Sequence, residues 1–342
     1  MTAVSVAIAY TICAGIMNGS FALPSKYAKN WRFENLWLNY AVWAFFILPW
    51  VSIFILEPNI WRIYAMIPSY TLFILIVGGF LFGIGQICFA LAMRTIGIGL
   101  GFVINIGLGT GLGFLFPLVF LHPEAIWTSF GLVTLIGIIF IIGGLLLSYY
   151  AGHQRDLSKK FNPETLAAKS SYKLGVLFAI IAGIGSAGQN FTFALTSNMQ
   201  QLALVAGVKM LAAAIVIWPA FLTCAFIPYG VYMLYLHGKN TSFNAYKTPN
   251  SARNYGFAVI MAILWFGSLI AYSQAALWIG STGPIVAWPL FMVFIILTSN
   301  FWGWKSKEWA GCSADIKRHV FLAMVLLVVA VVILAYSAVL TP

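Results

Sequence analysis

Acidic side chains are scarce in this sequence of 342 residues. Asp and Glu together number 7, Lys and Arg number 18, and the four types make up 7% of the chain. About a quarter of the residues in a soluble domain are charged, so this composition excludes an ordinary soluble domain. Because 62% of the residues are hydrophobic, the chain is predicted to be an integral membrane protein that lies in a lipid bilayer.

The sequence also lacks the patterns that mark metal sites and active sites. The four cysteines stand singly, without a CxxC pair or a zinc-ligand spacing. All seven carboxylates fall in expected loops or at helix ends, and no HExxH, GxSxG or P-loop pattern occurs. We therefore expect neither an enzyme nor a bound metal or other cofactor.

Long unbroken apolar runs dominate the sequence instead. A helix needs about 20 mostly apolar residues to cross a bilayer, whereas barrel strands alternate over about 10 residues. The runs predict an all-α membrane protein with ten transmembrane helices, at approximately 3–24, 35–56, 70–92, 96–121, 126–150, 174–197, 203–235, 255–279, 282–304 and 320–340. The seventh is long enough to tilt or break, and Pro219 and Pro228 are the candidate positions.

The basic residues predict the orientation. All but two of the 18 Lys and Arg fall in the odd-numbered loops, and the exceptions are Arg62 and Lys209. The positive-inside rule then predicts cytoplasmic odd loops and both termini outside, in a multi-pass protein of the inner (plasma) membrane. Since the basic residues lie between apolar runs, the net charge of +11 reflects topology and not a nucleic acid partner.

The two halves of the chain resemble each other. The segment Asn18-Gly-Ser-Phe-Ala-Leu23 recurs as Asn190-Phe-Thr-Phe-Ala-Leu195, and Ile47-Leu-Pro49 recurs as Ile217-Trp-Pro219. We therefore predict a first five-helix repeat at 1–150, a basic cytoplasmic linker at 151–173 and a second repeat at 174–342. Five helices are an odd number, so the two repeats must be inverted, an architecture suited to alternating access.

Neutral polar side chains within the helices are the candidate binding groups. Such groups need partners in hydrocarbon, so they should face the interior of the bundle. Amides, with indoles as flat apolar surfaces, would suit a neutral solute such as a sugar. Hydrogen bonding between helices is the alternative role. The predicted substrate-binding residues are Asn18, Gln86, Asn105, Asn190, Tyr272, Gln274 and Trp288.

Lys209 is the one cation expected inside a helix, about one turn into the seventh. Two roles are open for it. Its ammonium group could extend to the membrane interface, or it could contact the solute or change protonation during transport. The second role makes Lys209 a candidate coupling or gating residue.

Several segments resemble the L-rhamnose–proton symporter family of the drug/metabolite transporter superfamily. They include Lys29-Asn-Trp31-Arg-Phe-Glu34, Ile47-Leu-Pro-Trp50, Gly83-Ile-Gly85-Gln86 and Lys307-Glu308-Trp309. The resemblance implies ten helices, an inverted repeat, sugar uptake and protons as a second substrate. It also implies an acidic residue near the start of the ninth helix, where this chain has Gly283-Pro-Ile-Val-Ala-Trp288-Pro-Leu290 without a carboxylate.

We therefore predict a secondary transporter that moves a small neutral solute, such as the monosaccharide L-rhamnose, by alternating access, with proton symport as one option. One alternative is a facilitator or exporter of another metabolite or of amphipathic drugs, which would need a wider aromatic cavity. Another is a membrane scaffold or sensor, which would need no continuous cavity.

Overall fold

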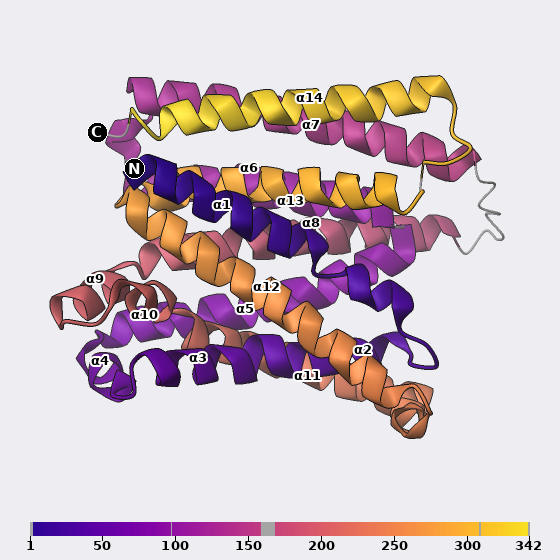
Figure 1. Ribbon diagram of the computed structural model, residues 1–342, viewed down its shortest axis with the longest axis horizontal. Coiled ribbons are helices and arrows are strands. Elements are labelled where there is room, and N and C mark those ends of the chain that lie inside the picture. Colours follow the sequence, from indigo (N-terminus) through magenta and orange to yellow (C-terminus); the bar gives the residue numbers. More distant parts are fainter. Residues whose placement is uncertain (1–2, 97, 159–167, 308, 341–342) are drawn as a thin grey trace.

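The computed structural model describes residues 3–96, 98–158, 168–307 and 309–340, and all regular structure in these ranges is helical (Figure 1). Ten segments are long and apolar enough to cross a membrane. The predicted all-α fold with ten transmembrane helices is therefore confirmed. Both chain ends lie at the same end of the bundle, as an even number of crossings requires.

The first five spans contain the following helices: α1 (Ala3–Ser20) with the 3-10 helix η1 (Leu23–Tyr27), α2 (Phe33–Ala41) with the π-helix η2 (Val42–Ile47) and α3 (Leu48–Leu56), α5 (Ser69–Ile96), α6 (Ile98–Leu121) and α7 (Ser129–Ser158). The short helices α4 (Ile60–Met66) and η3 (Pro123–Ala125) connect them.

The last five spans contain these helices: α8 (Ala168–Leu195) with α9 (Asn198–Val205), α10 (Met210–Ile215) with α11 (Trp218–Asn240), α12 (Ser251–Ile279), α13 (Gly283–Lys305) and α14 (Ala314–Ser337). The 3-10 helix η4 (Ser242–Lys247) follows α11. Of the predicted linker, 151–158 continue α7 and 168–173 begin α8, while 159–167 lie outside the described residues.

Proline interrupts the second and seventh spans at matching positions. Proline has no N–H, and its ring clashes with the carbonyl four residues earlier, so it favours the first turn of a new helix. Accordingly α3 begins one residue before Pro49, after the π-helix, and α11 begins one residue before Pro219. The predicted break at Pro219 is confirmed, whereas Pro228 lies within α11.

The start of the seventh span differs from the prediction. Residues 198–205 form the separate helix α9, and the span itself begins at Met210 rather than at residue 203. Gly207 has a φ of 82°, a left-handed conformation that glycine adopts readily, and it turns the chain between the two helices. Lys209 is consequently the residue just before α10, not a residue inside a helix.

Helix packing has the pattern that an inverted repeat requires. Helix α8 packs on α5 and α6, and α1 packs on α12 and α13. In each case the first span of one half packs on the third and fourth spans of the other half. The pair of α7 and α14, which lie together along one edge in Figure 1, maps onto itself. The packing supports the predicted repeat, which stays a prediction.

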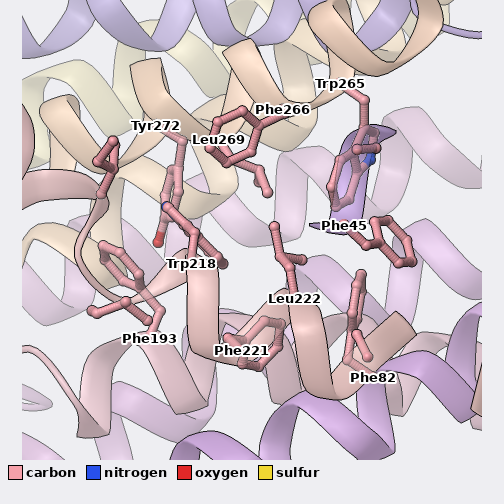
Figure 2. Close-up of a cluster of buried hydrophobic side chains, with 14 of the residues drawn as sticks. Phe45, Phe82, Phe193, Trp218, Phe221, Leu222, Trp265, Phe266, Leu269 and Tyr272 are labelled. Atoms are coloured by element: carbon pink, nitrogen blue, oxygen red, sulfur yellow. The ribbon is translucent and has the colours of Figure 1, made fainter. Parts of the chain in front are cut away.

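The largest buried cluster lies between α11 and α12. Figure 2 shows Trp218 and Leu222 of α11 pointing toward the side chains of α12. The indole N–H of Trp218 donates to the Ser273 hydroxyl at 2.7 Å, and its ring stacks on Phe193 of α8 with centroids 5.4 Å apart. Hydrogen bonding of the buried indole lets the tryptophan pack inside the bundle without an unsatisfied polar group.

Close helix contacts at glycine generate the first prediction. A Cβ at Gly83 of α5 would stand 2.2 Å from the Ala225 carbonyl oxygen of α11, whereas a Cβ at Gly111 of α6 would meet nothing within 4 Å. Backbone cannot move aside cheaply, so Gly83→Ala should destabilise the fold by about 1–3 kcal/mol. Thermal unfolding in detergent should show a lower Tm for Gly83→Ala than for the control Gly111→Ala. Equal Tm values would contradict this packing.

Candidate functional site

A cavity of about 100 Å³ lies in the centre of the bundle. Its lining comes from α1, α5, α6, α8, α12 and α13, so both halves of the chain contribute. The lining residues are Asn18, Phe21, Phe82, Gln86, Phe89, Asn105, Ile106, Ser186, Gln189, Trp265, Leu269, Trp288, Phe291, Met292 and Ile295. None of them is charged, and four of the seven predicted substrate-binding residues are among them.

Two amide atoms at the cavity have no partner among the described residues. They are the Asn105 Oδ1, an acceptor, and the Gln189 Nε2, a donor, and both atoms are buried. A buried amide group without a hydrogen-bond partner destabilises the fold by about 1–3 kcal/mol, so such groups are uncommon outside functional sites. One unpaired acceptor and one unpaired donor beside the same cavity fit a solute whose groups both donate and accept hydrogen bonds.

Two other predicted residues form the walls of the cavity. The Asn18 amide donates to the Ser268 hydroxyl at 2.9 Å, which joins α1 to α12. The Trp288 indole N–H donates to the Gly109 carbonyl oxygen at 2.9 Å. Its ring fills the space beside Gly113, where a Cβ would stand 2.4 Å from the indole nitrogen. With its N–H engaged, Trp288 offers the cavity apolar ring surface.

Asn190 and Tyr272 are not lining residues of the cavity. Asn190 is fully buried, and its amide donates to the carbonyl oxygens of Gly113 at 2.8 Å and Pro284 at 3.0 Å. The Tyr272 hydroxyl donates to the Asn190 Oδ1. These bonds join α8, α6, α13 and α12, so the structure gives the two residues the helix-joining contacts that were the alternative to substrate binding.

A second, larger cavity of about 450 Å³ lies beyond this network, where α6, α8 and α12 end. Its lining includes Tyr70, His122, Phe193, Gln200 and Pro284. Tyr272 lies between the two cavities. Its ring centroid is 5.2 Å from that of Phe193, which lines the larger cavity, and 5.5 Å from that of Trp288, which lines the central cavity. The network of Asn190 and Tyr272 therefore separates the two spaces.

Gln274 and Lys209 lie apart from the central cavity. The Gln274 amide donates to the Met210 carbonyl oxygen at 3.2 Å, in the first turn of α10. Lys209 is exposed at the preceding position. The structure therefore brings Asn18, Gln86, Asn105 and Trp288 together at one cavity, and it leaves Asn190, Tyr272, Gln274 and Lys209 outside it.

Gln189 is a site residue that the predicted set lacks. It directly precedes Asn190 on α8, and adjacent residues on a helix point about 100° apart. Only the packing of α8 against its neighbours decides which of the two amides lines the cavity. The sequence alone identified Asn190 through its match to Asn18 and gave no comparable signal for Gln189.

Comparisons of the sequence with protein families and with individual proteins agree on one family. The family described as L-rhamnose-proton symport protein matches residues 1–340. The L-rhamnose-proton symporter of Pectobacterium atrosepticum is 27% identical over 326 residues, 91% of each chain. The symporters of that name from Escherichia coli O1:K1 and Yersinia pestis Pestoides F are each 26% identical, the first over 96% of each chain and the second over 84% of this chain and 85% of its own.

The bonds of Asn190 generate the second prediction. Asn190→Ala would leave the Tyr272 hydroxyl and two buried carbonyl groups without their partner, at a cost of about 1–3 kcal/mol per buried group. Asn18→Ala removes a single bond, and the Ser268 hydroxyl keeps its bond to the Trp265 carbonyl at 2.5 Å. Unfolding in detergent should therefore be earlier for Asn190→Ala than for Asn18→Ala. The reverse order would show that the network contributes little.

Proposed function

Since this chain belongs to the family of L-rhamnose-proton symport proteins, we propose that it carries L-rhamnose together with protons by alternating access. As a member of this family the chain is a sugar–proton symporter and not an enzyme. Its ten apolar spans make it a multi-pass protein of the inner membrane.

The proposal that the central cavity binds the sugar rests on its two unpaired amide groups. A sugar hydroxyl both donates and accepts, so one hydroxyl can donate to the Asn105 Oδ1 while another accepts from the Gln189 Nε2. These bonds would replace part of the hydration shell of the sugar, and the faces of Trp265 and Trp288 would cover its apolar C–H surface. An uncharged lining is consistent with a neutral substrate.

The size of the cavity favours this substrate class over amphipathic drugs. Sites for drug-sized ligands occupy about 300–1,000 Å³, whereas the central cavity measures about 100 Å³. A small solute needs only modest movement of the surrounding side chains. A scaffold or sensor would not need cavities inside the bundle, so the presence of two cavities supports transport.

Alternating access would work by opening and closing the layer between the two cavities. The proposed closed layer consists of the hydrogen bonds of Asn190 and Tyr272, which join α6, α8, α12 and α13 between the two cavities. Relative movement of α8 and α13 would break the bond to the Pro284 carbonyl and connect the two spaces. Asn190 and Tyr272 are thus proposed to be gate residues, which open and close the path of the sugar without contacting it in the central cavity.

Lys209 and Gln274 are proposed to act at the same end of the carrier. Gln274 links α12 to the first turn of α10, and Lys209 stands exposed just before that turn. A change in the position of α10 would move both residues. This geometry supports a gating role for Lys209 more than direct contact with the sugar.

Sugar uptake into proteoliposomes tests the function and generates the third prediction. An inward-directed proton gradient should drive accumulation of radiolabelled L-rhamnose by the wild type. Asn105→Ala and Gln189→Ala should each raise the KM about tenfold, since loss of one hydrogen bond to a buried partner costs about 1–3 kcal/mol. The control Asn59→Ala alters an exposed residue outside both cavities. Unchanged KM values in both cavity variants would remove the proposed site.

Orientation is the fourth prediction. We propose that both termini and the loop that contains Asn59 face the outside, and that the loop that contains Lys247 faces the cytoplasm, because the basic residues gather in the odd loops. In a cysteine-free background, a membrane-impermeant maleimide added to intact cells should label Asn59→Cys and leave Lys247→Cys unlabelled. The opposite labelling pattern would invert the topology.

A further inference from the structure

The described part of the chain buries one carboxylate and one imidazole, and the two lie in the same cluster. Glu34 of α2 is 2% exposed and His237 of α11 is 0% exposed. The side chains of Glu124 and Asp315, by contrast, are 71% and 70% exposed. The cluster lies where α2, α11 and η4 meet, at the end of the bundle away from the termini (Figure 1).

The partners of His237 determine which ring nitrogen carries the proton. Its Nδ1 lies 2.8 Å from the Met233 carbonyl oxygen, which can only accept, so Nδ1 is the donor. Its Nε2 lies 2.9 Å from the Tyr246 hydroxyl and 3.4 Å from the Asn35 amide nitrogen, and both groups can donate. In the neutral ring, Nε2 therefore accepts a hydrogen bond through its single lone pair, which is also the position where a proton would add.

The same atoms also accommodate the protonated ring. Burial raises the pKa of Tyr246 to about 12, so its phenol keeps its proton at physiological pH. When Nε2 gains a proton it can donate to the Tyr246 oxygen, and the phenol can turn to the Asn35 carbonyl oxygen at 3.4 Å. Both protonation states of His237 are then satisfied without a large movement of heavy atoms.

Glu34 supplies a negative charge for the protonated ring. Its Oε1 accepts from the Asn240 amide at 2.9 Å, and the carboxylate is near enough to His237 for their charges to interact. The other groups that face the cluster are Arg32, which donates to the Asn240 carbonyl oxygen at 2.9 Å, and Tyr246 of η4. A charged ring in this site would thus have an opposite charge in its surroundings, which lowers the cost of burying it.

The cluster joins the two halves of the chain beside the sugar path. Glu34 belongs to the first half, and His237 and Tyr246 belong to the second. Further along the same helices, Trp37 of α2 and Tyr229 of α11 line a small hollow that shares Gln86 with the central cavity. A movement of α2 relative to α11 that changes this small hollow therefore also changes the contacts of the cluster.

We infer that His237 is the residue that takes up the transported proton, with Glu34 as its counter-charge, an inference that rests on the proposed symport. The proton adds to the Nε2 lone pair, and no bond between heavy atoms forms or breaks. Separation of α2 from α11 would remove the counter-charge, which favours release of the proton. It would also admit water, which can accept the proton at this end. Coupling then needs no carboxylate at the start of α13.

Two transport assays on His237→Gln test this inference and form the fifth prediction. Glutamine retains hydrogen-bonding groups but cannot titrate. Accumulation of L-rhamnose driven by a pH gradient should fall about tenfold or more, while exchange of labelled for unlabelled L-rhamnose at equal pH should stay within about twofold of the wild type. The matched control is His319→Gln, a partly exposed histidine beside Asp315, which should change neither assay.

Each remaining outcome decides the inference. Accumulation by His237→Gln at the wild-type level would overturn it and leave the proposed function intact. A wild type that neither accumulates nor exchanges L-rhamnose would overturn both. If His237→Gln also loses exchange, the same two assays on Glu34→Gln decide between the outcomes. This variant keeps an oxygen that can accept from Asn240 but carries no charge. Lost accumulation with retained exchange would support the inference, and retained accumulation or loss of both activities would overturn it.

Discussion

Every polar group inside this bundle is constrained by the lack of water in the hydrocarbon core. An unpaired N–H or C=O there costs several kcal/mol, so a membrane helix must pair its polar side chains or expose them to a cavity. Trp218 and Asn190 illustrate the first solution, with bonds to Ser273 and to two backbone carbonyls. Asn105 and Gln189 illustrate the second, because their free atoms lie at the central cavity.

The same constraint explains how far the sequence could predict the molecule. Apolar runs about 20 residues long can only become helices in a bilayer, so ten spans followed directly from their number and length. The break at Pro219 followed from the missing N–H of proline. The separate helix at 198–205 did not, because its apolar end at Leu202–Val205 leads directly toward the next helix and only the turn at Gly207 divides the two.

The site was predictable in kind but only partly in detail. Neutral amides and indoles were expected to form it, and Asn18, Gln86, Asn105 and Trp288 do lie at one cavity. Rotation of a helix about its own axis cannot be read from a sequence in which every face is apolar, so Asn190 was chosen where Gln189 lines the cavity. The burial of His237 could not be predicted, because it lies at a helix end, where exposure is the usual expectation, and η4 covers it.

Trp288 lines the central cavity, but its position there depends on two glycines that do not line it. Its indole ring occupies the space left by Gly113, and its N–H is held by the Gly109 carbonyl. The two glycines are one helical turn apart on α6, so together they fix the position of one aromatic side chain. Selectivity for the size of the sugar can therefore be encoded in the backbone of α6, and relatives could change their substrate there without altering any group that touches it.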